Sequence, residues 1–211
     1  MLKIENIRPA DIESRSFEII TQELGPRQLD PRQAPIIKRC IHTSADFDYA
    51  DNLYFSDGAV ERMLAALRAG AHIVTDTQMA RAGINKTVLA RFGGQVHCFM
   101  SDSDVAAEAR QRQVTRAVVS MERAAALSGP LLFAIGNAPT ALLHLVELAG
   151  QGCVGPAGII GVPVGFVNVI ESKERLIESG LCCIAARGRK GGSNIAACIC
   201  NALLYMADGR Q

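Results

Sequence analysis

A histidine and an arginine three residues apart are the pair best suited to acid–base chemistry in this sequence. His42 ends the apolar stretch "IIKRCIH" at residues 36–42, and Arg39 shares its face if that stretch is helical. The positive charge of Arg39 would disfavour a second positive charge on the imidazole, which leaves His42 neutral and ready to exchange a proton. The spacing alone leaves a simpler interpretation open, in which His42 is a structural residue stabilised by the helix dipole.

The segment "RGRKGGSN" at residues 187–194 combines three positive charges with three glycines. Glycine lets the backbone approach a ligand, and a helix capped by Ser193 or Asn194 would present free N–H groups there. These features are typical of anion binding. The order of Lys190 and the glycines matches neither the Walker phosphate loop nor the dinucleotide fingerprint. An ordinary loop with solvated charges is the alternative.

Other hydrogen-bonding residues follow further apolar runs, in the segments "DTQM" (76–79), "GNAPT" (136–140) and "GVPVGFVN" (161–168). In an open α/β sheet such positions lie at the carboxyl ends of the strands, where ligands bind. The side chains of Thr77, Gln78 and Asn137 could therefore contact a ligand. Asp76 and Asn137 could equally serve as helix caps.

Ser16 shares a helical face with Ile12 and Ile19 in the stretch 11–24, and we expect this face to point inward. A buried serine usually bonds to its own helix, which is the default interpretation. The alternative is that Ser16 faces a ligand cavity.

No metal site or nucleophile is predicted. The aspartates after His42 lack the glycine and distal glutamate of an EF-hand loop, and we interpret them as solvated loop and cap residues: Asp46, Asp48 and Asp51. The remaining histidines are interpreted as structural: His72, His97 and His144. The seven cysteines show no zinc spacing and are predicted to be reduced, buried thiols, and no G-x-S-x-G elbow occurs.

The elements that must position these residues alternate along the chain from about residue 70. Apolar runs typical of strands covered on both faces occur at 72–76, 95–99, 130–136, 157–162 and 181–188. Helical patterns occur at 114–128, 138–150, 168–180 and 193–206, and in the N-terminal part at 11–24, 36–42 and 57–70. The alternation predicts an α/β fold with a five-stranded parallel sheet, helices on both faces and an N-terminal helical segment.

The composition points to a single domain over residues 1–211. A net charge of +1, 5% aromatic residues and no Trp argue against a nucleic-acid partner. The chain shows no signal-peptide pattern and no apolar run long enough for a membrane span, so we expect a cytoplasmic protein with no membrane partner.

Six segments together resemble the precorrin-8X methylmutase family, which isomerises a cobalamin precursor. They are "RSF", "RCIHTSADFDYADNLYFSDGAV", "GAHIVTDTQMARAGI", "FAIGNAPTALLHL", "PAGIIGVPVGFVNVIESKERLIESG" and "ARGRKGGSNIAACICNALLYM". The likeness spans nearly the whole chain, and residues 95–116 are its least distinctive part.

The resemblance implies a flavodoxin-like, three-layer α/β/α fold and a homodimer. It implies a contracted tetrapyrrole substrate with many carboxylates, precorrin-8X or cobalt-precorrin-8, and no cofactor. A methyl group would move from ring carbon 11 to ring carbon 12, giving hydrogenobyrinate or cobyrinate. The catalytic histidine of the R-x-x-H motif falls on His42, and family substrate contacts fall on Ser16 and Arg39.

A ligand with many carboxylates needs donors spread around a wide crevice, and charged donors make the strongest hydrogen bonds to it. The full set of expected substrate contacts is Ser16, Arg39, Thr77, Gln78, Arg116, Asn137, Asn168, Arg187, Arg189, Lys190, Gly191, Gly192 and Ser193. Two other functions are weighed: a non-catalytic corrinoid-binding carrier protein, and a phosphate or nucleotide binder using residues 187–194. The sequence does not distinguish a metal-free substrate from a cobalt-bearing one.

Overall fold

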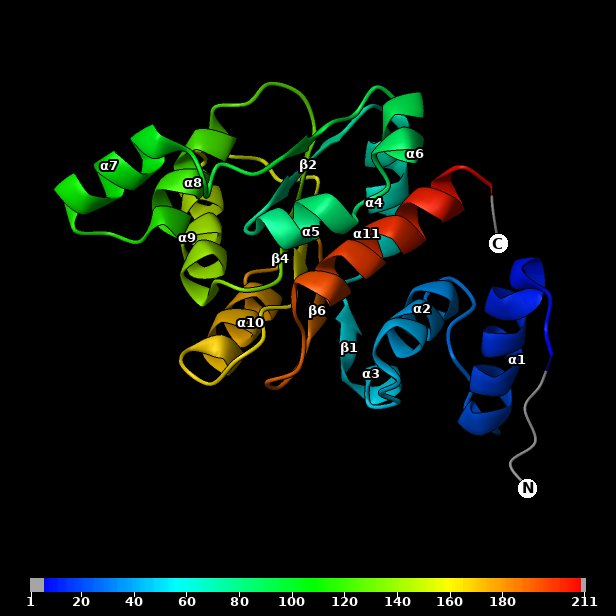
Figure 1. Ribbon diagram of the computed structural model, residues 1–211. Helices are drawn as coiled ribbons and strands as arrows, with labels where there is room; N and C mark the ends of the chain where they lie inside the picture. The colour runs from blue at the N-terminus through cyan, green and yellow to red at the C-terminus, as the bar shows by residue number, and fades with distance from the viewer. Residues whose placement is uncertain (1–5, 210–211) are drawn as a thin grey trace.

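The chain folds around one mixed β-sheet, seen in a computed structural model that describes residues 6–209 (Figure 1). The sheet has six strands in the order β1-β6-β5-β4-β2-β3. The strands are β1 Leu53–Phe55, β2 His72–Thr75, β3 Val96–His97, β4 Leu131–Ile135, β5 Gly158–Gly161 and β6 Cys183–Ala186. The five predicted parallel strands are confirmed as β2 to β6, each shorter than its apolar run.

The prediction of a five-stranded, wholly parallel sheet is wrong by one strand. β1 pairs antiparallel with the edge of β6, with Leu53 opposite Ala186. It is only three residues long and follows at once on the short helix α3 Tyr49–Asn52, so it carries no periodic signal of its own.

The helices lie before and between the strands. Those predicted are α1 Ile12–Leu24, α2 Ala34–Ser44, α4 Ala59–Arg68, α8 Arg116–Ala125, α9 Pro139–Gly150, α10 Val169–Glu178 and α11 Ser193–Ala207. Those not predicted are η1 Pro9–Asp11, α3, α5 Gln78–Gly83, α6 Lys86–Arg91 and α7 Ser103–Arg112. None of the residues 6–209 forms a helix that is both long and apolar enough to cross a lipid bilayer.

Both faces of the sheet are buried under helices. Along β4, Leu132 and Ala134 join a core with α2, α4 and α11, whereas Leu131, Phe133 and Ile135 join a second core with α8, α9 and α10. Figure 1 shows these two groups of helices on opposite sides of the strands. Because successive strand residues point to opposite faces, a central strand covered on both sides must be apolar throughout, and β4 is.

Candidate active site

His42 lies in the last turn of α2 with its side chain exposed. The helix turns its apolar residues Ile37 and Ile41 into the core, which leaves His42 on the outer side. Ala45 ends the helix in the left-handed region, where its N–H donates to the carbonyl of Ile41. The imidazole is 5.4 Å from the Phe17 ring of α1, measured between centroids. It is therefore positioned by packing at one side and open at the other.

Arg39, one turn earlier, is held more firmly. Its guanidinium pairs with Glu13 at 2.8 Å and lies over the rings of Phe17 and Tyr205, at 5.4 and 4.9 Å. It lines a groove of about 760 Å³ between α1, α2 and the end of α11, with Phe17, Pro31, Pro35, Lys38, Ala202, Tyr205, Met206 and Gly209. The Glu13 carboxylate offsets part of the positive charge that was expected to act on His42.

The expected inward position of Ser16 is wrong. Ile12 and Ile19 on the same face are 53% and 38% exposed, while Ile20 and Leu24 are buried. Ser16 takes its default role and donates to the carbonyl of Ile12 at 2.9 Å. α1 carries two apolar stripes, and the sequence pattern does not say which of them packs on α2.

Asp76 joins the carboxyl ends of β2 and β4. Its buried carboxylate accepts three bonds, from the N–H groups of Gly136 at 2.9 Å, Asn137 at 2.8 Å and Ala138 at 2.6 Å. Burial raises the pKa of Asp76, and the three bonds oppose that rise. Asp76 is therefore not the cap of the helix after β2. Thr77 caps that helix, and its hydroxyl accepts from the N–H of Ala80 at 3.0 Å. Nor does the Asn137 side chain cap α9.

The start of α11 packs directly against these two strand ends. The hydroxyls of Ser193 and Thr77 are 2.8 Å apart, and a methyl group on Gly136 would lie 2.8 Å from the carbonyl oxygen of Gly192. Gly192, with φ +129°, takes the cap position that was expected for Ser193 or Asn194. Gln78 extends toward the next strand end, donating to the Ser101 hydroxyl at 3.3 Å.

The loop of residues 187–192 carries the three expected cations. Arg187 lies over the Tyr54 ring at 5.5 Å and Arg189 over the Phe166 ring at 5.4 Å. Lys190 contacts the carboxylates of Asp46 and Asp48, both at 2.6 Å, and these raise its pKa. Its ammonium is thus shared with two carboxylates of this chain.

The aspartates after His42 lie in the loop and at the start of α3, and the side chains of Asp48 and Asp51 are exposed as expected, but all three also form ion pairs that were not predicted. Asp46 and Asp48 hold Lys190, and Asp51 pairs with Arg27 at 2.8 Å. The first two contacts tie the end of α2, and with it His42, to the loop of residues 187–192. The described residues contain no group of three or more histidine, cysteine, aspartate or glutamate side chains arranged to hold a metal ion.

The remaining expected contacts lie exposed around the same edge of the sheet. Asn137 follows β4, and Asn168, with φ +56°, precedes α10. Arg116 begins α8, whose cap Thr115 is 3.2 Å from Thr140 in the first turn of α9. The structure therefore brings most of the expected contacts to the carboxyl edge, and the contact of Asp46 with Lys190 brings the end of α2 with His42 near it. Arg39 lies against Tyr205 toward the other end of α11, and Ser16 lies on α1.

One residue of this region was missed. Lys173 of α10 is fully buried and donates to two carbonyls of the loop, those of Gly188 and Lys190. A signal existed, because Lys173 is four residues after Val169 and three before Leu176, both buried, and so occupies a core position of its helix.

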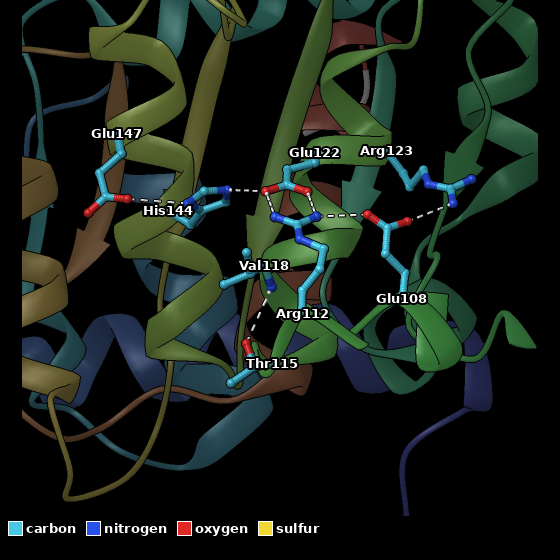
Figure 2. Close-up of polar contacts among 8 residues, drawn as sticks. All are labelled: Glu108, Arg112, Thr115, Val118, Glu122, Arg123, His144 and Glu147. Atoms are coloured by element: carbon cyan, nitrogen blue, oxygen red, sulfur yellow. Dashed lines mark hydrogen bonds and ion pairs between the residues drawn. The ribbon is translucent and has the colours of Figure 1, made fainter. Parts of the chain in front are cut away.

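The histidines interpreted as structural lie away from this cluster. His97 Nε2 is 3.2 Å from His72 Nδ1 across β2 and β3, and burial lowers the pKa of His97. His144 joins a charged network on α7, α8 and α9, where it contacts Glu122 and Glu147 (Figure 2). The cysteines are all free, and Cys153 is the one that is exposed.

Comparison with known proteins bears directly on this arrangement. Residues 11–206 match the family described as precorrin-8X methylmutase. A cobalt-precorrin-8 methylmutase from Priestia megaterium is 43% identical over 202 residues, which cover 96% of this chain and 90% of the relative. A protein of that name from Salmonella typhimurium is 48% identical, with 94% and 95% covered. The crystal structure of the precorrin-8X methylmutase from Thermus thermophilus has a TM-score of 0.86 and 42% identity, with 95% and 97% covered.

Proposed function

The chain belongs to the precorrin-8X methylmutase family of cobalamin-biosynthetic isomerases, and from that premise we propose that His42 is its catalytic acid. The reaction is an intramolecular methyl shift on a carboxylate-rich tetrapyrrole, from ring carbon 11 to ring carbon 12. The observation that carries the proposal is an exposed imidazole beside an edge with donors on several strand ends. The carrier alternative is not supported, since the relatives are named as methylmutases.

In this proposal His42 donates a hydrogen bond or a proton to a ring nitrogen of the substrate. This withdraws electron density from the conjugated system while the methyl group migrates, which is general-acid catalysis. A methyl shift within one molecule requires no nucleophile, and the rest of the catalysis is positioning of the substrate. The packing of the imidazole against Phe17 supports such a fixed approach.

We propose that the substrate carboxylates are bound by the donors around the edge, and by Arg39 and Ser16. The charged donors are Arg39, Arg116, Arg187, Arg189 and Lys190; the others are Ser16, Thr77, Gln78, Asn137, Asn168, Ser193 and the N–H groups of Gly191 and Gly192. Phe166 and Val167 beside them are 82% and 77% exposed. Exposed apolar side chains next to cations suit a ligand with an apolar face and an anionic rim.

We further propose a flavodoxin-like single domain that forms a homodimer. The parallel strands run β3-β2-β4-β5-β6, which is the 2-1-3-4-5 order of flavodoxin-like sheets. The exposed Ile12 and Ile19 on α1 support a protein interface there. Analytical ultracentrifugation should give twice the 22.5 kDa mass of one chain.

The role of His42 is tested by the substitution His42→Ala. We expect kcat to fall by about 100- to 10,000-fold, which is the usual contribution of a general acid, while the tetrapyrrole still binds. Turnover is measured anaerobically by the change of the substrate absorbance into that of the product. The matched control is His72→Asn. His72 is the first residue of β2, at the end of the strand away from the carboxyl edge, and this variant should keep normal turnover. Near-normal turnover by the His42 variant would refute the assigned role.

We propose the cobalt-bearing tetrapyrrole as the natural substrate, since both sequence relatives carry that substrate in their names. The same absorbance assay with cobalt-loaded and metal-free substrate should give the higher kcat/KM for the cobalt form. A higher kcat/KM for the metal-free form would contradict this choice.

A further inference from the structure

Lys173 is a buried cation with an unusual set of partners. Its side chain is fully buried, and its Nζ donates to the carbonyl oxygens of Gly188 at 2.9 Å and Lys190 at 2.8 Å. It forms no ion pair with a carboxylate anywhere in residues 6–209. The neighbouring Glu174 lies 3.7 Å from Arg187 instead.

This arrangement is costly, because a lysine is almost never fully buried without an anionic partner. Burial lowers the pKa of Lys173 to about 8. A methionine or leucine at a core position of α10 would avoid that cost. The lysine therefore has to be explained by the two carbonyls that it holds.

Those two bonds determine which way the loop presents its N–H groups. In a planar trans peptide the C=O and the N–H of the next residue point in opposite directions. With the carbonyls of Gly188 and Lys190 turned inward onto Lys173, the N–H groups of Arg189 and Gly191 point away from it. Neither N–H donates to a described residue of the chain.

The backbone at Gly191 and Gly192 restricts the conformation of the loop. Gly191 has φ +155°, and a methyl group on it would lie 2.2 Å from the carbonyl oxygen of Val162. The N–H of Gly192 donates to that same oxygen at 2.9 Å. One end of the loop is thus fixed by Val162 and the other by Lys173, with two free N–H groups between them.

We propose that Lys173 is a positioning residue, which aims the N–H groups of Arg189 and Gly191 at one carboxylate of the substrate. Two N–H groups that leave the backbone on the same side, two residues apart, can both donate to one anion, and the Arg189 guanidinium beside them adds charge. The inference rests on the proposed function for the identity of the anion. The grip of Lys173 on the loop is independent of that function.

Ionisation of Lys173 is part of this grip, since an ammonium is a stronger donor to carbonyls than a neutral amine. Loss of the proton as the pH rises through about 8 should loosen the loop. The charged groups around Lys173 are Glu174 with Arg187, and Lys190 with Asp46 and Asp48. The variant Lys173→Arg leaves all of them in place and keeps a cation at high pH, so it separates the titration of Lys173 from theirs.

The test compares wild type with Lys173→Met and Lys173→Arg. We expect KM to rise about ten- to hundredfold in the methionine variant, as for lost charge-assisted bonds, with kcat changed by less than about threefold. In wild type KM should rise above about pH 8, and the arginine variant should not show this rise. The control is Lys86→Met, an exposed lysine that also donates to a carbonyl, with no expected change in KM.

Amide hydrogen exchange of residues 187–192 tests whether Lys173 holds the loop, independently of whether the chain has methylmutase activity. Faster exchange in Lys173→Met, without any methyl-shift activity in wild type, supports the grip on the loop and refutes the proposed function. Unchanged exchange and unchanged KM in a folded methionine variant overturn the inference. If that variant does not fold, the inference is decided by wild type against Lys173→Arg: a wild-type KM that is flat from pH 6.5 to 9.5 overturns it.

Discussion

Charges are used in opposite ways in two regions of this molecule. In the network on α7, α8 and α9, each cation meets carboxylates: Arg112 lies 2.7 Å from Glu108, and Arg123 lies 3.0 Å from the same side chain (Figure 2). The network consists of Asp104, Glu108, Arg112, Glu122, Arg123, His144 and Glu147. It joins three helices, and its cations are already paired with carboxylates of the network.

Around the loop of residues 187–192, several cations contact aromatic rings or backbone carbonyls. Arg189 lies over a ring, Lys173 holds carbonyls, and the closest carboxylate to Arg187 is 3.7 Å away. Lys190 is held by two carboxylates, which tie the loop to the end of α2. Arg189 has no carboxylate partner among the described residues, so it has binding capacity left for an anionic ligand. Positive charges on the surface therefore stabilise helix packing in the network and are available for ligand binding at the loop.

The largest difference between the two regions, in stability and in KM, is expected from substitutions of a backbone glycine. Gly191→Ala would place a methyl group 2.2 Å from the Val162 carbonyl, so we expect the free energy of unfolding to fall by about 1–3 kcal/mol. The displaced loop should also raise KM. The matched change on a network helix is Gly150→Ala at the end of α9, where a methyl group meets nothing within 4 Å.

Urea unfolding and steady-state kinetics of both variants measure this difference. Gly150→Ala should leave KM unchanged and be neutral or stabilising by up to about 1 kcal/mol. A Gly191→Ala enzyme with wild-type KM would show that the loop shape does not matter for the substrate.

A smaller difference is expected between single arginines. Arg189→Ala should raise KM about tenfold, because one charge-assisted bond to a carboxylate is lost. Arg123→Ala removes an equal charge from the network and should leave KM within about twofold, since exposed ion pairs contribute little. Product binding followed by absorbance gives the same comparison without turnover. Equal effects of the two substitutions would remove the distinction between the regions.

The fold could be predicted wherever burial gives a recognisable sequence pattern, which is a continuous apolar run for a strand or a helical period for a helix. The strands from β2 to β6 are apolar because helices cover both faces, and their order along the chain follows from the alternation. β1 and α3 could not be predicted, since three or four residues contain no period. α7 has six polar residues and three alanines among its ten, with Val105 and Ala109 as its buried residues, and gives too weak a pattern.

The site could be predicted only as a set of positions. Strand ends and the glycine-rich loop marked Thr77, Asn137 and Arg189 correctly as edge residues, because parallel strands end on the same side. The partners could not be predicted. The contact between Asp46 and Lys190 joins residues 144 positions apart, and it depends on how α2 packs.

The smallest effect concerns the network itself. The hydrogen bond from Arg112 lowers the pKa of Glu122 below its ordinary value of 4.5. Because the folded pKa lies below the unfolded one, this stabilisation is present above about pH 4.5 and is lost as the pH falls through the folded pKa. Glu122→Gln should therefore lower the free energy of unfolding at pH 7 by about 0.5–1 kcal/mol, and by less at pH 3.5 or in high salt.

Urea unfolding at both pH values measures this, with Glu178→Gln on α10, an exposed carboxylate outside the network, as the control for the loss of one negative charge. KM should be unchanged in the Glu122 variant, since the network occupies its own charges. A rise in KM would mean that Arg112, once released from Glu122, or the helices it joins, act on the substrate site. The two regions would then be one electrostatic unit, and the separation of structural from binding charges would have to be given up.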